Sequence, residues 1–251
     1  MTQAAGTLTV ALDGQALPQT IAATAAGVPG TKQLPVTTLT AGTKHLTLTG
    51  AGSFGVYGVQ LLPVLRAIPS SFWATAGPFT TAISNGAGMD NASLTKAMAA
   101  QYGPETQAAA DAVFADTTGA ERKWTLNRIS YPGALNERGV DFAIRCKSSH
   151  SDLCFAQTFI TAPRACDLLV MVATDWWANL YLNGQVVKTP DAKLFDGTGS
   201  WFNSKYFVPV VLPLQAGVNR LLVKNQAGSM GNSFMLYAVD SPDITFAPSG
   251  K

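Results

Sequence analysis

The stretch Asp175–Val187, DWWANLYLNGQVV, combines a tight turn with two adjacent tryptophans. Asn183–Gly184 is the two-residue signal of a tight β-hairpin, because both residues tolerate positive φ. The residues before this turn are therefore expected to form a strand, on which successive side chains point to opposite faces. At most one of Trp176 and Trp177 then enters a single core, unless the backbone bends there. The other indole packs against a second layer, faces solvent or contacts a ligand.

The chain on both sides of this stretch is a series of short β runs. They are rich in β-branched and aromatic residues and are separated by Gly, Asn or Pro. The runs are KWTLNRISY (123–131), VDFAIRC (140–146), CFAQTFITA (154–162), CDLLVMVAT (166–174), ANLYLNGQVV (178–187), YFVPVVLPL (206–214), NRLLVKNQ (219–226) and SFMLYAVD (233–240). This pattern predicts an all-β sandwich or jelly roll. Trp73 and Trp124 begin such runs and are expected in the core, whereas Lys224 is expected to be an outward-facing charge.

Residues 7–62 also alternate as strands do. In HLTLTG, Leu46 and Leu48 share one face and the threonines between and after them share the other. About 60 residues make only a marginal core, so this part either packs on the rest of the chain or is the surviving half of a sandwich. RAIPSS (66–71) is the expected boundary. The predicted organisation is a small β module at residues 1–66, with the C-terminal part of a sandwich as one alternative for it, and a larger module at 71–245.

Two helices are predicted between the modules' strands. Residues 91–102 and 105–116 are rich in alanine and carry apolar residues at helical spacing. Pro104 suits the first turn of a helix, and Glu105 suits a helix N-terminus because a negative charge is favourable there. The sequence therefore predicts a short helical insertion in the larger module.

The chain carries unusually little charge. Charged residues make up 13% of it and the formal net charge is +2, with no cluster of Lys or Arg. Phosphate binding needs clustered cations, so a nucleic-acid partner is excluded. A surface of Thr, Ser, Asn, Gln and Gly is typical of extracellular proteins that act on neutral polymers. No apolar run approaches the ~20 residues that cross a bilayer, so no membrane partner is expected.

The N-terminus lacks the pattern of a signal peptide. Three origins therefore stay open: a cytoplasmic protein, an excised piece of a larger exported protein, or a virion component. The three cysteines leave a second question open. Cys146 and Cys154 flank KSSHSDL and are expected either to pair across a hairpin or to be free buried thiols. Cys166 is left over in both cases.

Several motifs together resemble a known family. They are FWATAGPF (72–79), QYGPET (101–106), KWTLNRI (123–129), TDWWANLYLNGQVV (174–187), LPLQAGVNRLLVKNQAG (212–228) and SFMLYAVD (233–240). In this order they resemble the galactose-binding-like β-sandwich modules appended to bacterial glycoside hydrolases and other polysaccharide-degrading enzymes. The resemblance covers Phe72 to Val239. Residues 1–65 resemble the closing strands of another such sandwich. The sequence departs from the family's pattern at Trp176 and in the helical insertion.

The resemblance implies a jelly roll of two antiparallel sheets that holds glycans or supports a catalytic domain and is itself noncatalytic. Many such modules carry a structural calcium, and no other cofactor is indicated. Asp175, Asp191 and Asp196 offer oxygen ligands for calcium, although an aspartate before a turn more often bonds nearby amides.

Loop-borne aromatic residues are the candidate carbohydrate site. A sugar's C–H face stacks on an aromatic ring while neighbouring polar groups bond its hydroxyls. The predicted carbohydrate-binding residues are Trp176, Trp177, Trp201, Tyr206, Asp175, Asn179 and Asn203. The alternative is that one ring of each adjacent pair fills the core and the other covers the sheet edge.

Catalytic groups are sparse. His45 and His150 are the only histidines, and the loop neighbours Ser149, His150 and Asp152 cannot form an oriented triad by themselves. No glutamates pair in a way that suggests glycoside hydrolysis. The sequence therefore favours a noncatalytic carbohydrate-binding or accessory region, extracellular as part of a larger protein, with a polysaccharide or oligosaccharide and a catalytic domain of the same parent as partners. The alternative is a virion or filament subunit whose tryptophans bury against a neighbouring copy.

Overall fold

The computed structural model describes residues 7–22, 45–51, 64–81, 91–126, 139–149, 152–175, 177–187, 202–203, 207–228 and 231–250. The chain divides into two compact units, Met1–Leu62 and Pro63–Lys251. Strands in antiparallel sheets dominate both units, which confirms the predicted all-β class. None of the described helices is long and apolar enough to cross a bilayer.

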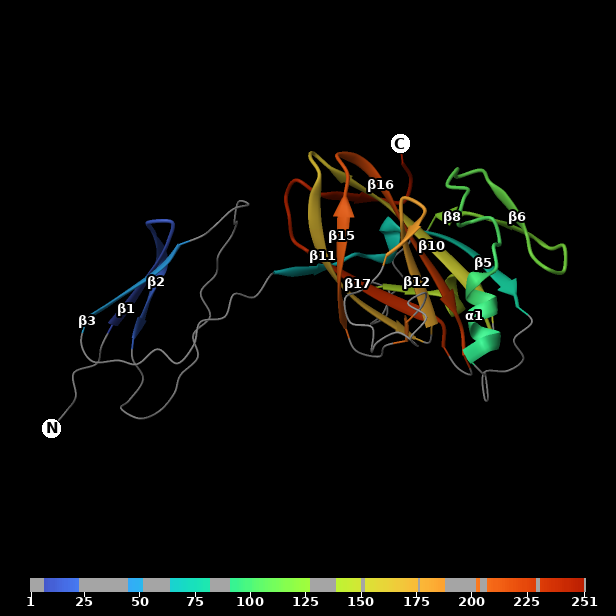
Figure 1. Cartoon of the computed structure of the whole chain (residues 1–251), viewed down its shortest axis with the longest axis horizontal. Helices are drawn as coiled ribbons and strands as arrows, with labels where there is room; N and C mark the ends of the chain where they lie inside the picture. The colour runs from blue at the N-terminus through green and yellow to red at the C-terminus, as the bar shows by residue number, and fades with distance from the viewer. Residues whose placement is uncertain are drawn as a thin grey trace. The chain divides into compact units, whose positions relative to one another are not determined.

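The first unit contains a three-stranded antiparallel sheet in the order β2-β1-β3. Its strands are β1 (Thr7–Leu12), β2 (Gln15–Ala22) and β3 (Leu46–Ala51) (Figure 1). Val10 is buried and faces Leu48 across the sheet. Leu46 and Leu48 are half-buried, whereas Thr47 and Thr49 are exposed. The alternation predicted for HLTLTG is therefore confirmed.

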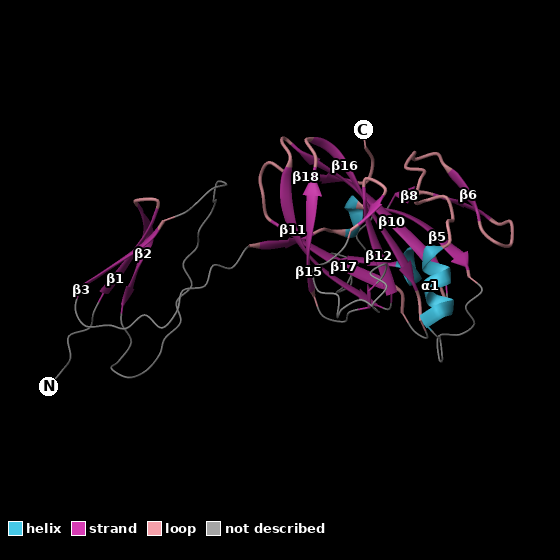
Figure 2. Cartoon of the chain, in the orientation of Figure 1, coloured by secondary structure: helices cyan, strands magenta, loops and turns pink. Residues whose placement is uncertain are grey.

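The second unit is a sandwich of two antiparallel sheets (Figure 2). The eight-stranded sheet has the order β13-β12-β16-β10-β5-β8, with β14 beside β12 and β18 beside β10. Its strands are β5 (Ala74–Thr80), β8 (Thr125–Leu126), β10 (Asp152–Ala162), β12 (Trp177–Leu182), β13 (Gln185–Val186), β14 (Phe202–Asn203), β16 (Gly217–Gln226) and β18 (Thr245–Ala247).

The five-stranded sheet has the order β15-β11-β17-β4, with β9 beside β17. Its strands are β4 (Leu65–Ala67), β9 (Gly139–Asp141), β11 (Cys166–Asp175), β15 (Val208–Leu214) and β17 (Ser233–Val239). Because β4 pairs with β17, Arg66 lies in the second unit rather than in the first module. A separate hairpin joins β6 (Val113–Ala115) to β7 (Glu121–Lys123).

The space between the two sheets holds the main core. Alternate residues of β10, β11, β15, β16 and β17 enter it, as period-2 patterning requires. Trp73 is fully buried there and meets Phe234 edge-to-face, with ring centroids 4.8 Å apart. Trp124 is buried in a second cluster, described below. The core positions predicted for both tryptophans are confirmed.

The turn signals in the sequence serve one polar junction. Asn183 and Gly184 adopt φ of 51° and 81°, as the predicted tight turn requires. Asn183 Nδ2 donates to Asn219 Oδ1 at 2.9 Å, and Asn219 Nδ2 donates to the Gln215 carbonyl at 2.8 Å. Asn219 therefore ties two neighbouring turns together, which gives a structural role to the G-x-N motif that begins at Gly217.

Two predicted segments have other structures. The run 140–146 is not one strand: β9 ends at Asp141, and the short helix α2 (Phe142–Arg145) follows. The Asp141 carboxylate accepts hydrogen bonds from the amides of Ala143 and Ile144, which starts the helix. Residues 105–116 are not a helix, whereas α1 (Asn91–Ala99) lies within the other predicted helix. A 3₁₀ turn (Ser70–Phe72) precedes β5.

Residues 91–123 cover the outer face of the eight-stranded sheet, and we call this segment the insertion. Leu94 and Met98 of α1 are buried with Phe155 and Leu222, whose side chains point away from the main core. Figure 1 shows α1 in front of the sheet. The eight-stranded sheet is therefore covered on both faces at this point.

A buried lysine attaches the insertion to the sheet. Lys224 is 0% exposed, and its Nζ donates to the carbonyls of Met98 and Ala100 at the end of α1 and to Glu105 Oε1 at 2.8 Å. Glu105 also accepts from the amide of Tyr102. The expectations that Lys224 faces solvent and that Glu105 begins a helix were wrong. Lys224 does point away from the main core, but the insertion covers that face.

Burial lowers the pKa of Lys224, and the charge of Glu105 acts against this shift. The ammonium also lies 5.0 Å from the ring centroid of Tyr102 and 5.7 Å from that of Phe155. Three acceptors and two ring faces therefore replace the water that Lys224 loses.

The cysteines are free thiols in the structure, and Cys146 and Cys154 are buried. Burial raises the pKa of the Cys154 thiol well above its usual value, and the neighbouring Cys146 raises it further. Of the two alternatives for this pair, the structure has the free buried thiols.

The hairpin of the insertion is organised by Asp116. Its carboxylate accepts hydrogen bonds from Thr118 Oγ1 at 2.6 Å, the Thr118 amide at 2.8 Å, the Ala120 amide at 3.0 Å and Arg122 Nη2 at 3.0 Å. The Thr118 hydroxyl is the main cause of the lowered pKa of Asp116. The ionised carboxylate therefore stabilises the turn between β6 and β7.

Replacing Lys224 by methionine is expected to leave Glu105 buried without its cationic partner and to lower the free energy of unfolding by about 3–5 kcal/mol. The double variant K224M/E105Q removes both charges and should be less destabilised than K224M. Urea denaturation measures both, with the exposed Lys123→Met as the matched control. A K224M variant as stable as K123M would contradict the role given to the pair.

Acid is expected to weaken the hairpin through Asp116. Because its folded-state pKa lies below its ordinary value of 3.8, its contribution to stability is full above that pH and is lost as the pH falls through the folded-state pKa. Asp116→Asn should lower the free energy of unfolding by about 2 kcal/mol at neutral pH. It should also make the free energy of unfolding less dependent on pH in the acidic range. Denaturation of both proteins from neutral to acidic pH is the measurement, and parallel profiles would argue against the assignment.

Candidate functional site

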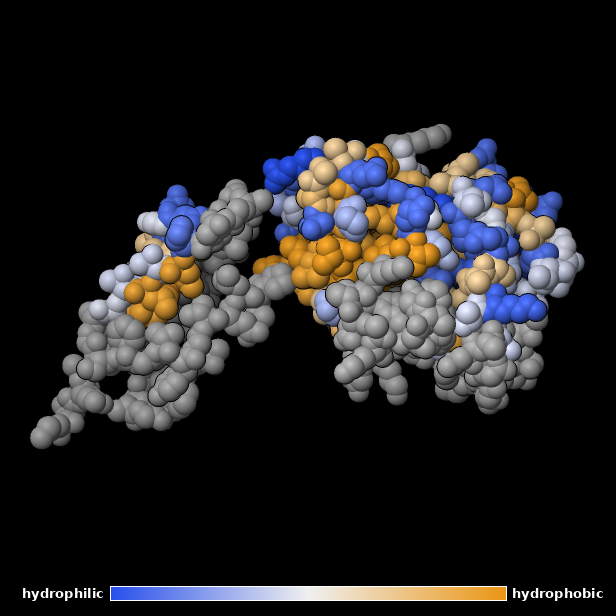
Figure 3. Space-filling model, in the orientation of Figure 1, coloured by the Kyte–Doolittle hydropathy of each residue, from blue (hydrophilic) through white to orange (hydrophobic). Residues whose placement is uncertain are grey.

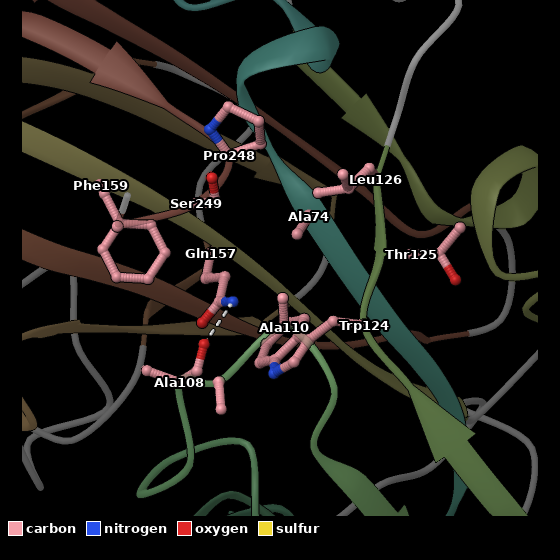
Figure 4. Close-up of a pocket in the computed structure, with 12 residues that line it drawn as sticks. Ala74, Ala108, Ala110, Trp124, Thr125, Leu126, Gln157, Phe159, Pro248 and Ser249 are labelled. Atoms are coloured by element: carbon pink, nitrogen blue, oxygen red, sulfur yellow. Dashed lines mark hydrogen bonds between the residues drawn. The ribbon is translucent and has the colours of Figure 1, made fainter.

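An open cleft of about 730 Å³ lies on the outer face of the eight-stranded sheet, next to the insertion (Figure 4). Three parts of the chain line it: strands β5, β8 and β10 with Trp124, the insertion, and the C-terminal segment. The lining residues are Ala74, Ala108, Ala109, Ala110, Trp124, Thr125, Leu126, Gln157, Phe159, Pro248, Ser249 and Gly250.

Strand pairing builds the floor of this cleft. Gln157 of β10 is the partner of Ala74 in β5, and Ala74 is the partner of Leu126 in β8, so the three residues form one row across the sheet. Phe159 lies two residues further along β10 and therefore points to the same face. In Figure 4, the Gln157 amide lies between the rings of Phe159 and Trp124.

The Gln157 amide is held on both sides. Its Nε2 donates to the Ala108 carbonyl at 3.2 Å, and its Oε1 accepts from Arg220 Nε at 2.8 Å. The side chain is 1% exposed. Gln157 therefore joins the floor of the cleft to its alanine wall.

Arg220 also forms hydrogen bonds to the segment that makes this wall. Its Nη2 donates to the Pro104 carbonyl at 2.6 Å and its Nη1 to the Glu105 carbonyl at 3.3 Å. Its guanidinium lies 5.8 Å from the ring centroid of Trp124. Burial lowers the pKa of Arg220 to about 10, so it remains cationic at neutral pH. These contacts take up the carbonyls that a helix at residues 105–116 would have used.

The aromatic side chains of the cleft are fixed by their neighbours. Trp124 is 7% exposed, packs edge-to-face on Phe114 at 5.6 Å, and donates its Nε1 to the Gln107 carbonyl at 3.3 Å. Phe159 contacts the C-terminal segment: a Cβ added to Gly250 would lie 3.0 Å from its ring. Trp124 thus keeps one orientation without a ligand.

The lining contains no ionisable side chain among the described residues. Its rings and methyl groups suit an apolar surface, while the hydroxyl of Ser249 is suited to bonding a polar one. Such a cleft suits a neutral ligand with an apolar face and hydroxyls. None of the described side chains that line it can act as a general acid or base.

The structure brings two of the predicted carbohydrate-binding residues together. Trp177 begins β12, and Asn203 of β14 is its pairing partner, although the side chain of Asn203 is outside the described part. Trp177 is half-buried and packs against the second cluster. Trp176, Trp201 and Tyr206 lie outside the described residues.

Asn179 and Asp175 have different surroundings. Asn179 is 4% exposed, is the pairing partner of Lys224, and donates its Nδ2 to Tyr181 Oη at 3.3 Å. It serves the interior, because the insertion covers the face on which it lies. Asp175 is exposed at the end of β11, and partial burial raises its pKa, as does the charge of Asp141.

No group of three His, Cys, Asp or Glu side chains suited to a metal occurs among the described residues. Asp191 and Asp196, named above as candidate calcium ligands, lie outside that part of the chain. The structure therefore assigns no ligands to the calcium that the resemblance implies.

The cleft itself was not predicted from the sequence. Trp177 pairs with Gln226, whereas Phe159 pairs with Arg220, so the two places are six residues apart along β16, or about 20 Å. Trp124 was predicted only as a core residue. The sequence signal that could have indicated the cleft was a tryptophan directly before a short strand.

No protein-family model matches the chain, and no curated protein sequence gives a significant match. Among solved structures, 44% of the chain aligns with a β-glucosidase from Kluyveromyces marxianus, at 14% identity and a TM-score of 0.31. The same enzyme in complex with glucose aligns over 44% of the chain, at 16% identity and a TM-score of 0.28. The chain covers 14% and 13% of these two structures.

A family 35 carbohydrate-binding module from an environmental isolate aligns over 46% of this chain and 79% of that module, at 18% identity and a TM-score of 0.28. All three alignments cover less than half of this chain.

Proposed function

We propose that this chain is a noncatalytic carbohydrate-binding region of a secreted polysaccharide-degrading enzyme, and that the cleft beside the insertion holds the sugar. The observation that carries the proposal is the lining of the cleft. It combines two aromatic rings with small alanine walls and has no ionisable side chain among the described residues.

A neutral sugar matches this lining. Its C–H face stacks on the ring of Phe159 and on the accessible part of Trp124, because aromatic rings are flat, apolar and lose little entropy on binding. Ala109 and Ala110 leave room for the sugar ring. Ser249 is placed to bond its hydroxyls at the open side.

The same lining supports a role in binding rather than in hydrolysis. Glycoside hydrolysis ordinarily needs two carboxyl groups on either side of the scissile bond, and none lines the described cleft. Catalysis then belongs to another part of the parent enzyme, and this region keeps that part near its polymer.

Titration with neutral plant and algal polysaccharides, followed by calorimetry, tests the proposal. Ala110→Trp should fill the cleft and abolish binding, since Ala110 lines it and is exposed. Phe159→Ala should weaken binding about tenfold through the loss of one stacking ring. Ala143→Trp places the same indole on the exposed surface of α2 and should bind as the unaltered protein does.

Two outcomes would contradict this assignment. If no polysaccharide in the panel binds, the carbohydrate function fails. If Ala110→Trp binds normally while Trp177→Ala does not, the ligand lies at the pair of Trp177 and Asn203, where the sequence placed it.

A further inference from the structure

The outer face of the five-stranded sheet is apolar where an open sheet face ordinarily carries polar residues. Leu168, Val170 and Val172 of β11 enter the main core. The alternate residues of that strand, Leu169 and Met171, therefore point outward. The same alternation on the other strands turns outward Pro209, Val211, Met235, Tyr237, Leu65 and Ala67.

These side chains form continuous rows. Met171 is the partner of Pro209 on one side and of Tyr237 on the other, and Tyr237 is the partner of Ala67, so one apolar row crosses four strands. Leu169 and Val211 begin the next row. Phe207 extends the surface by an edge-to-face contact with Tyr237 at 5.0 Å. We call this surface the apolar face.

The apolar face is exposed to solvent in the second unit. Val211, Phe207 and Leu65 are 44%, 40% and 37% exposed. Figure 3 shows hydrophobic residues gathered over β11 and β15. Contiguous apolar surface of this kind on a folded domain marks a contact with another molecule.

Charged residues of the described strands lie outside these rows. Asp167 and Asp175 are at the two ends of β11. Arg66 alternates with the outward residues of β4 and forms an ion pair with Asp240 at 3.6 Å. The middle of the face therefore has no charge and few polar groups with which to select an unlike partner.

We propose that the apolar face joins two copies of this chain in a face-to-face dimer. A neutral surface meets its own copy without like-charge repulsion, and a two-fold dimer needs only this one surface. Four strands at about 4.8 Å and six residues at about 3.3 Å give roughly 400 Å² per copy, or roughly 800 Å² in the dimer. That is below the ~1,200 Å² at which stable specific interfaces begin, so the dimer is weak, reversible and formed at high protein concentration.

Sedimentation of the full chain over a range of concentrations tests the dimer. The unaltered protein should be mainly dimeric at about 100 µM and should dissociate on dilution. Val211→Lys and Met171→Lys each place a charge in the contact and should raise the dissociation constant at least tenfold. Val218→Lys adds the same charge to a residue of β16 that is 55% exposed and should associate normally.

Circular dichroism and urea denaturation establish that each variant is folded. A protein that stays monomeric at every concentration would overturn the proposal, as would folded Val211→Lys and Met171→Lys variants that associate as Val218→Lys does. Unaltered carbohydrate binding in Val211→Lys is the expected companion result, because the cleft lies on the other sheet.

Discussion

The attachment of the insertion to strand β16 is the constraint on which the second unit depends. Arg220 and Lys224 are four residues apart on one strand and point to the same face. Lys224 donates hydrogen bonds to the Met98 carbonyl and to the Glu105 carboxylate, and Arg220 donates one to the Gln107 carbonyl. Desolvating two cations is costly unless every donor finds an acceptor. The path of the insertion, and with it the wall of the cleft, follows from that requirement.

Local patterns predicted the β architecture well. The strand at 219–226 and the Asn183–Gly184 turn depend on neighbours in the sequence, and the structure has both as expected. The burial of Lys224 has no such local sign. A lysine that faces water and a lysine that faces a covering segment both occupy the strand positions that point away from the core, so the sequence pattern is the same. Its partner Glu105 is distant in the sequence. Because Glu105 follows Pro104 at the beginning of an alanine-rich run, the local pattern predicted a helix start there.

The cleft was hidden from the sequence for a related reason. Gln157, Ala74 and Leu126 form a row only through the pairing of three strands, which no local pattern specifies. Asn179 was predicted to bond a sugar because it lies close in the sequence to the loop-borne tryptophans, yet it is 4% exposed and the insertion covers its face. Local sequence patterns thus predicted the turns correctly, but they did not predict which face of the eight-stranded sheet the insertion covers.

Arg220 has a dynamic consequence. It bonds to the floor of the cleft through Gln157 and to the wall through Pro104, so a fluctuation that detaches the wall also frees the floor. The two then open as one cooperative unit. A bound sugar would slow amide hydrogen exchange across the whole of residues 105–110, including amides that the sugar never touches.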